Sequence, residues 1–308
     1  MQARALVAVG SVDLDHYGRM RTEISERRVS VGECTLNVAE AGSGPPVLLL
    51  HGFPERWQMW RNQIPALADA GYRVIAPDLR GFGESDRPDQ VAAYGLRHLV
   101  GDVRGLLDDC GLEQVNVVGH DWGAGLAWAV ATFLPDRVST LVPISVGHGL
   151  TRAAAGEQQR QLSWYMLWFQ FPGVAERVLP ADDWAAFRAW AWPGVAPGSD
   201  PDAERQIADL SRPGALTAAL NWYRANIDPE HYVVLAPHTK LPPVACPTMG
   251  VWSDGDPYLA EAQMTASAEF VSGPWRYERL TGVGHWIPVH APDRLNALLL
   301  DFLTSSRQ

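Results

Sequence analysis

The stretch Val115-Asn-Val-Val-Gly-His-Asp-Trp-Gly123 decides the fold of this 308-residue chain. Its first four residues are typical of a buried strand, and the residues from Gly123 to Phe133 are typical of a helix. The backbone must therefore turn sharply at Asp121, which lies between them. Gly119 and Gly123 stand two positions on either side of Asp121, where side chains would clash in so tight a turn. Such a turn lifts the Asp121 side chain above the end of the strand, which makes its carboxylate the candidate nucleophile.

Strands and helices alternate on both sides of this turn. The expected helices cover Trp57–Ala70, Leu96–Cys110, Gly123–Phe133 and Asp293–Leu303. The expected strands cover Arg28–Val31, Thr35–Ala41, Val47–Leu50, Tyr72–Ala76, Val115–Val118, Thr140–Val146, Met249–Trp252 and Trp275–Leu280. Alternation of this kind predicts an α/β protein with a mostly parallel, doubly wound sheet.

The alternation stops between residues 148 and 245. This segment has a helical pattern that is broken at the Pro-Gly pairs Pro172-Gly173, Pro193-Gly194 and Pro213-Gly214. Its six tryptophans indicate either a wide aromatic cavity or packing within the segment; they are Trp164, Trp168, Trp184, Trp190, Trp192 and Trp222. We predict a helical cap at 148–245, a core formed by residues 26–147 and 246–308, and an N-terminal extension at residues 1–25.

The composition excludes several classes of function. Hydrophobic residues make up 47% of the chain and charged residues 19%, which is enough apolar material for a large core. The formal net charge of -10 would repel nucleic acid and anionic membranes, which attract clustered Lys and Arg. The sequence shows neither a leader-like N-terminus nor a membrane-spanning run of about 18 apolar residues. We therefore expect a cytoplasmic protein that binds a neutral small molecule; no pattern indicates its oligomeric state.

The cysteines give no sign of a metal site. Cys34, Cys110 and Cys246 are far apart and form no CxxC pair, so neither a disulfide framework nor a zinc site is indicated. We expect the protein to need no metal and no organic cofactor.

A base and an acid that would work with Asp121 are expected after the last two strands. His285 lies in a glycine-rich loop, and only histidine deprotonates water near neutral pH without a large pKa shift. Two carboxylates, Asp254 and Asp256, follow the strand expected to end at Trp252, and either could orient this histidine. The order along the chain is then nucleophile, acid and base.

Two backbone N–H groups are candidates for an oxyanion hole. His51-Gly-Phe-Pro54 follows the first continuously apolar strand, at a position where the Phe53 N–H could face the reacting atoms. The Trp122 N–H comes directly after the nucleophile. Together these donors could hold the oxyanion that forms when water attacks an ester at Asp121.

Three motifs resemble those of the soluble, microbial and plant type epoxide hydrolases. They are His51-Gly-Phe-Pro-Glu55, Arg80-Gly-Phe-Gly-Glu-Ser85 and Gly119-His-Asp-Trp-Gly123, and the likeness covers nearly the whole chain after about residue 26. The resemblance implies an α/β-hydrolase fold with an inserted helical cap. In that family the acid stands four residues beyond a strand-end tryptophan and before a proline, which implies Asp256 rather than Asp254.

The resemblance also implies two cap tyrosines as proton donors. Tyr165 lies in the matching segment Trp164-Tyr-Met-Leu-Trp-Phe-Gln170, and Tyr223 lies in Asn221-Trp-Tyr-Arg224. Independently of the family, attack of a carboxylate on an epoxide creates an alkoxide, and a neutral tyrosine hydroxyl with a pKa of roughly 10 suits its protonation. The alternative is that both tyrosines only pack within the cap.

The sequence therefore predicts an epoxide hydrolase that converts a small apolar epoxide and water to a vicinal diol through a covalent ester at Asp121. A haloalkane or fluoroacetate dehalogenase is the alternative enzyme, because it uses the same nucleophile and Trp122 could supply an indole N–H to the halide. Phe53, however, stands where those enzymes often place Asn or Glu. A non-catalytic binding protein of the same fold is a third possibility, although every catalytic position holds a competent side chain.

Overall fold

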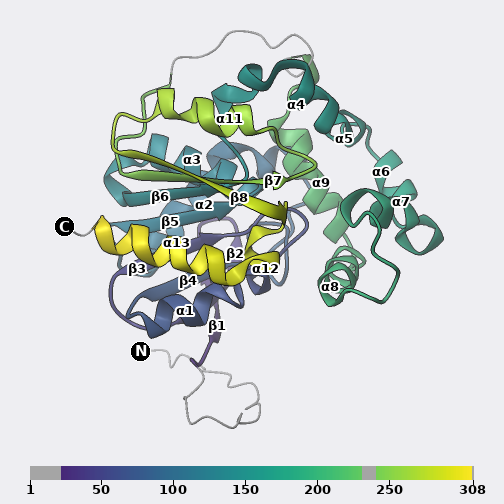
Figure 1. Ribbon diagram of the computed structural model, residues 1–308. Coiled ribbons are helices and arrows are strands. Elements are labelled where there is room, and N and C mark those ends of the chain that lie inside the picture. The colour runs from purple at the N-terminus through teal and green to yellow at the C-terminus, as the bar shows by residue number, and fades with distance from the viewer. Residues whose placement is uncertain (1–21, 231–240, 307–308) are drawn as a thin grey trace, which may run out of the picture.

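The computed structural model describes residues 22–230 and 241–306, which form an eight-stranded sheet covered by helices (Figure 1). The strand order is β1-β2-β4-β3-β5-β6-β7-β8; β2 pairs antiparallel with β1 and β4, and the other pairs are parallel. The strands are β1 (Ser25–Ser30), β2 (Thr35–Ala41), β3 (Pro46–Leu50), β4 (Arg73–Pro77), β5 (Val115–His120), β6 (Val138–Ile144), β7 (Thr248–Gly255) and β8 (Trp275–Gly284). The predicted α/β fold with a mostly parallel sheet is confirmed.

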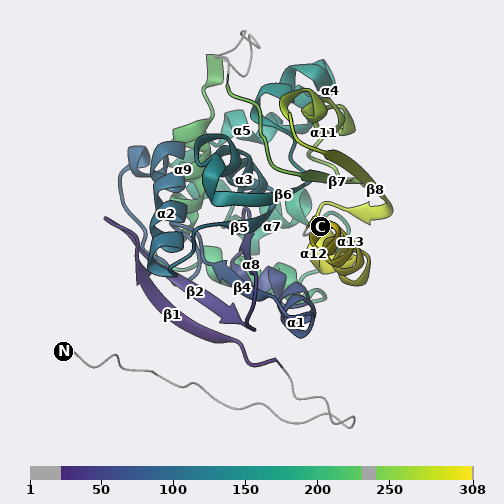
Figure 2. The same cartoon turned by 90° about the vertical axis from the view of Figure 1, so that its left-hand side faces the viewer.

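Helices bury both faces of the sheet, which explains why its central strands are apolar throughout. In β3, Val47 and Leu49 belong to one buried cluster, whereas Leu48 and Leu50 belong to the other, because successive side chains point to opposite faces. The covering helices are α1 (Gln63–Asp69) and α13 (Pro292–Ser305) on one face, and α2 (Leu96–Asp109), α3 (Trp122–Phe133) and α11 (Glu261–Ala266) on the other (Figure 2). None of the described helices is long and apolar enough to cross a membrane.

The prediction of one helix from Trp57 to Ala70 is wrong. The segment forms a 3₁₀ helix, η1 (Trp57–Trp60), and then α1, which begins at Gln63. Pro65 is the cause, because proline has no N–H and fits only the first turn of an α-helix. A continuous helix would place Pro65 in its interior.

A group of helices separates β6 from β7 in the sequence and lies at one side of the sheet (Figure 1). They are η4 (Gly149–Ala155), α4 (Gly156–Leu162), α5 (Trp164–Trp168), α6 (Val174–Val178), α7 (Ala181–Ala191), α8 (Pro201–Leu210) and α9 (Ala215–Asn226). Residues 231–240 of the segment expected to form a cap lie outside the described residues. So do residues 1–21 of the expected N-terminal extension.

Buried charges join α8 to the loops of the sheet. Glu55, only 2% exposed, accepts hydrogen bonds from Arg205 at 2.9 Å and from Gln206 at 2.8 Å. Asp202 pairs with Arg61 at 2.8 Å and also with Arg205. Because a buried carboxylate that loses its partner is costly, these contacts fix α8 against the core.

Candidate active site

Asp121 lies at the junction of β5 and α3, in a turn that its glycine neighbours permit. Its φ of 53° falls in the left-handed region, which is uncommon for residues other than glycine. A Cβ on Gly119 would lie 2.2 Å from the carbonyl oxygen of Gly123, and one on Gly123 would lie 2.1 Å from that of Leu50. The two glycines therefore allow the approach of backbone that holds Asp121 at the end of the sheet.

Gly123→Ala should lower the free energy of unfolding by about 2–3 kcal/mol, because its methyl group meets backbone atoms that cannot move aside. Gly125→Ala is the matched control in the same helix, since a Cβ there meets nothing within 4 Å. Alanine is favoured over glycine in a helix by roughly 0.8–1 kcal/mol, so the control should gain stability. Denaturant unfolding measures both, and equal changes would show that the close approach at Gly123 has no energetic role.

Asp121, His285 and Asp256 form a chain of contacts. His285 Nδ1 lies 2.7 Å from Asp256 Oδ2, and His285 Nε2 lies 3.7 Å from Asp121 Oδ2. The other oxygen of Asp256, Oδ1, accepts the backbone N–H groups of Tyr258 at 2.9 Å and Leu259 at 3.1 Å. One side of the Asp256 carboxylate is thus held by its own loop, which directs the other side toward His285.

Asp254, the other carboxylate considered as the acid, does not contact His285. The strand expected to end at Trp252 continues as β7 to Gly255, because β8 pairs along it as far as Gly284. Asp254 is therefore part of the strand, and its Oδ1 accepts the backbone N–H of Gly282 at 2.8 Å. The geometry brings Asp256 and not Asp254 to the histidine.

Both expected N–H donors act on the Asp121 carboxylate. The Phe53 N–H donates to Asp121 Oδ1 at 2.8 Å, and the Trp122 N–H helps to hold the pKa of this carboxylate below its ordinary value. His51 fixes the loop that carries Phe53, since its Nε2 accepts the Leu79 N–H at 2.8 Å. Burial lowers the pKa of His51 to about 4, so it is neutral and serves as a structural acceptor. With Oδ1 held by Phe53, Oδ2 is the oxygen of Asp121 that faces His285.

The electrostatics make Asp121 and His285 an ion pair. Burial alone lowers the pKa of His285, but the carboxylates of Asp256 and Asp121 outweigh it and raise this pKa to about 10. Burial alone raises the pKa of Asp121, yet its contacts with His285 and with the Trp122 N–H hold it below the ordinary value. At neutral pH the resting site therefore contains a carboxylate and an imidazolium.

Tyr165 of α5 and Tyr223 of α9 line the same cavity as Asp121 and His285. Their rings lie 6.1 Å apart, and the side chains are 4% and 2% exposed. Burial, together with Tyr165 and Asp121, raises the pKa of Tyr223 well above 10, so its hydroxyl keeps its proton. The ring of Trp122 lies 5.1 Å from that of Tyr223 at 87°, and the Trp122 side chain offsets part of this rise in pKa.

Arg224, next to Tyr223, fixes the helices that carry the two tyrosines. Its Nη1 lies 2.7 Å from Glu176 Oε1, and its Nε donates to the carbonyl oxygen of Phe169 at 2.9 Å. Phe169 directly follows α5, which contains Tyr165. This buried guanidinium therefore links α9 to α5 and α6 and sets the distance between the tyrosines.

The cavity is narrow, with a volume of about 20 Å³, close to the space that one water molecule needs. Its other lining residues are Phe53, Pro54, Trp190, Ala191, Tyr258 and Trp286. Of the six tryptophans between α4 and α9, Trp190 is the one that lines it. Trp222 is fully buried and donates its indole N–H to the Arg80 carbonyl oxygen, while Trp164 is exposed. The tryptophans of this segment mostly pack or face solvent, so they do not form a wide cavity.

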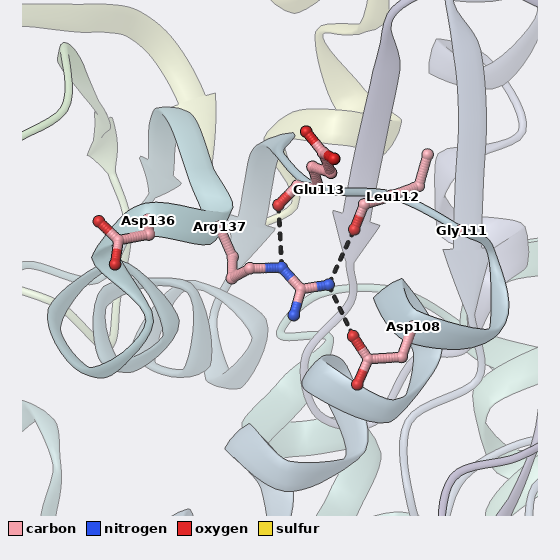
Figure 3. Close-up of a pocket in the computed structure, with 6 residues that line it drawn as sticks. All are labelled: Asp108, Gly111, Leu112, Glu113, Asp136 and Arg137. Atoms are coloured by element: carbon pink, nitrogen blue, oxygen red, sulfur yellow. Dashed lines mark hydrogen bonds and ion pairs between the residues drawn. The ribbon is translucent and has the colours of Figure 1, made fainter.

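A larger hollow of about 470 Å³ lies on the surface, near the C-terminal end of α2 (Figure 3). Arg137 points into it from η3 (Pro135–Arg137) and donates to the carbonyl oxygens of Glu113 and Leu112, at 2.9 and 2.8 Å, and to the Asp108 carboxylate at 2.8 Å. The guanidinium therefore forms its hydrogen bonds with residues at the end of α2 and in the loop that follows it. None of the expected catalytic residues lines this hollow, and the buried cavity is the candidate active site.

Two residues beside His285 were not singled out from the sequence. His120 is fully buried, donates from Nε2 to the carbonyl oxygen of His285 at 2.9 Å, and its ring lies 4.6 Å from the His285 ring. Tyr258 lies 5.1 Å from that ring at an angle of 88°. Both contacts join residues distant in sequence, so no local pattern predicts them. The available signs are the place of His120 directly before Asp121 and that of Tyr258 two residues after Asp256.

Comparisons with known proteins show the family of the chain. A model of the alpha/beta hydrolase fold family matches residues 45–292. Epoxide hydrolase A from Mycobacterium tuberculosis (strain ATCC 25618 / H37Rv) is 37% identical to this chain, and the match covers 91% of this chain and 97% of that protein. Epoxide hydrolase 1 from Siraitia grosvenorii is 35% identical, and the match covers 91% of this chain and 98% of that protein. The crystal structure of epoxide hydrolase A from Mycobacterium thermoresistibile has a TM-score of 0.75 at 35% identity, over 92% of this chain and 98% of that one. The chain therefore belongs to the epoxide hydrolases of the α/β-hydrolase fold.

Proposed function

We propose that this protein converts a small, uncharged epoxide to a vicinal diol through a covalent ester at Asp121. The observation that carries the proposal is the meeting of a partly buried carboxylate, an imidazole and two tyrosines at one cavity. Among residues 22–230 and 241–306, only Asp121 and His285 bring charge to the lining of that cavity, which favours a neutral substrate. The segment 148–245 acts as a cap, since it supplies both tyrosines.

In the first step, Asp121 Oδ2 attacks an epoxide carbon and the carbon–oxygen bond breaks. The electron pair goes to the epoxide oxygen, which takes a proton from the hydroxyl of Tyr165 or Tyr223. Ester formation removes the negative charge of Asp121, so the His285 imidazolium becomes more acidic and returns a proton to the tyrosinate. The site then holds an ester, neutral tyrosines and a neutral imidazole.

In the second step, neutral His285, oriented by Asp256, takes a proton from water. The resulting hydroxide attacks the ester carbonyl, and the Phe53 and Trp122 N–H groups stabilise the oxyanion. The tetrahedral intermediate collapses, and the departing alkoxide takes the second proton of that water from the new hydroxyl group. Diol, carboxylate and imidazolium result, so the cycle closes without a metal or an organic cofactor.

A single turnover in isotopically labelled water tests the ester directly. With enzyme in excess over epoxide, the oxygen added to the first diol should come from the Asp121 carboxylate and carry no label. Later turnovers should carry label, because the hydrolytic water exchanges the carboxylate oxygen. Labelled oxygen in the first diol would instead mean that water attacks the epoxide without an ester.

Tyr165→Phe and Tyr223→Phe should each slow ester formation by about 10- to 100-fold, and the double variant by about 10²- to 10⁴-fold, because the alkoxide loses its proton donors. Rapid mixing with styrene oxide, followed by intact-protein mass measurement, gives this rate.

A dehalogenase would respond differently, since a halide needs N–H donors rather than acids. Halide release from a haloalkane or fluoroacetate that survives both substitutions, without diol from styrene oxide, would favour that alternative.

A further inference from the structure

Tyr258 is a third tyrosine of the cavity, and the reaction proposed above does not use it. It lies in the loop after β7 and is 8% exposed. Its hydroxyl donates to the carbonyl oxygen of Trp190, in α7, at 2.9 Å. Because that bond engages its only proton, Tyr258 is poorly suited to protonate a substrate oxygen, unlike Tyr165 and Tyr223.

The ring of Tyr258 confines the His285 imidazole. The two rings lie 5.1 Å apart at 88°, and the ring of Trp286 lies 4.9 Å from the imidazole at 77°. His120 contributes a third ring at 4.6 Å. The hydrogen bond to Asp256 fixes Nδ1 of His285, so the packed rings restrict the rotation that would turn Nε2 away from Asp121.

Both the backbone and the hydroxyl of Tyr258 are tied to neighbouring elements. Its N–H donates to Asp256 Oδ1 at 2.9 Å, and its carbonyl oxygen accepts Nε2 of Gln159, from α4, at 2.8 Å. Gln159 is 2% exposed and also accepts the Ala260 N–H at 2.9 Å. Helices α4 and α7 therefore hold the loop and the ring of Tyr258 from two directions.

We propose that Tyr258 is a positioning residue for the hydrolytic step. Its ring keeps His285 Nε2 directed at Asp121, and its hydrogen bond to Trp190 keeps the ring in place. Ester formation depends on Asp121 Oδ2, Tyr165 and Tyr223, so loss of the Tyr258 ring affects water activation more than epoxide opening. This inference rests on the proposed function.

Two substitutions separate the roles of the ring and the hydroxyl. Tyr258→Leu removes both and should slow ester hydrolysis by about 10- to 100-fold, the range expected for a misdirected catalytic group. Ester formation should change by less than about threefold when it is measured at alkaline pH, where Asp121 is ionised with or without its contact to His285. Tyr258→Phe removes only the bond to Trp190 and should slow hydrolysis by about 2- to 10-fold. Tyr94→Phe is the matched control, because it removes a hydroxyl that donates to the Pro88 carbonyl oxygen at 2.8 Å. Tyr94 is buried but does not line the cavity, so this substitution should change neither rate.

Single-turnover mixing with styrene oxide measures both steps, with intact-protein mass following the ester and quenched samples following the diol. Accumulation of ester in Tyr258→Leu, to a lesser extent in Tyr258→Phe and not in Tyr94→Phe, supports the inference. An equal loss of both rates in Tyr258→Leu, or wild-type hydrolysis in both Tyr258 variants, overturns it. Wild-type enzyme that forms no ester with any epoxide would refute the proposed function instead, so the two failures are distinct.

Discussion

Diol formation by the Asp121→Ala variant should fall by about 10⁵-fold or more, because Asp121 is the only carboxylate among the described residues that line the cavity. The variant should also gain no mass when it is mixed with styrene oxide, since it cannot form the ester. Initial rates of diol formation and intact-protein mass measure the two effects.

Asp136→Ala is the matched control for this loss, because Asp136 is an exposed aspartate of the surface hollow in Figure 3 and lies outside the cavity. Its activity and its melting temperature should equal those of the wild type. If the Asp121→Ala variant kept more than about one hundredth of the wild-type rate while folded, another group would have to be the nucleophile.

The His285→Gln variant should form the ester but hydrolyse it about 10³- to 10⁴-fold more slowly, since water loses its general base. The enzyme should then release almost no diol, and its mass should rise by the mass of one epoxide. The assay should be run at alkaline pH, because His285 is the main group that holds the pKa of Asp121 down. Without this partner the carboxylate is protonated more readily and attacks only after it ionises.

His98→Gln provides the control, because His98 is an exposed histidine of α2 and does not line the cavity. It should leave both steps unchanged. A His285→Gln enzyme that turns over at close to the wild-type rate would exclude His285 as the base. A His285→Gln enzyme that forms no ester even at alkaline pH would show that the attack on the epoxide itself requires His285.

The sequence predicted the features that depend on short-range pattern. Alternating apolar strands and helices gave the parallel sheet, and the glycines beside Asp121 gave the turn because a Cβ at either position would meet backbone. The break before α1 was missed although Pro65 marks it, because the apolar spacing continues across the break. The full length of β7 was missed because its last residues are held by pairing with β8, which no local pattern contains.

The candidate site likewise contains some residues that local motifs predict and others that they do not. Asp121, His285 and the two N–H donors lie within recognisable local motifs, whereas the choice of Asp256 and of the two tyrosines depended on family resemblance. Tyr258 and His120 reach His285 through contacts between segments far apart in the chain, so only the folded arrangement reveals them. The narrowness of the cavity is likewise a property of packing, which the number of tryptophans does not determine.

The ion pair between Asp121 and His285 also sets the order of events in the proposed cycle. An imidazole that already carries a proton is unable to accept one from water, so the resting enzyme holds its base in an unreactive form. Only the arrival of substrate, by consuming the charge on Asp121, sets that base free. Hydroxide is then generated only after an ester is present for it to cleave. Formation of the covalent bond therefore determines when the base becomes active.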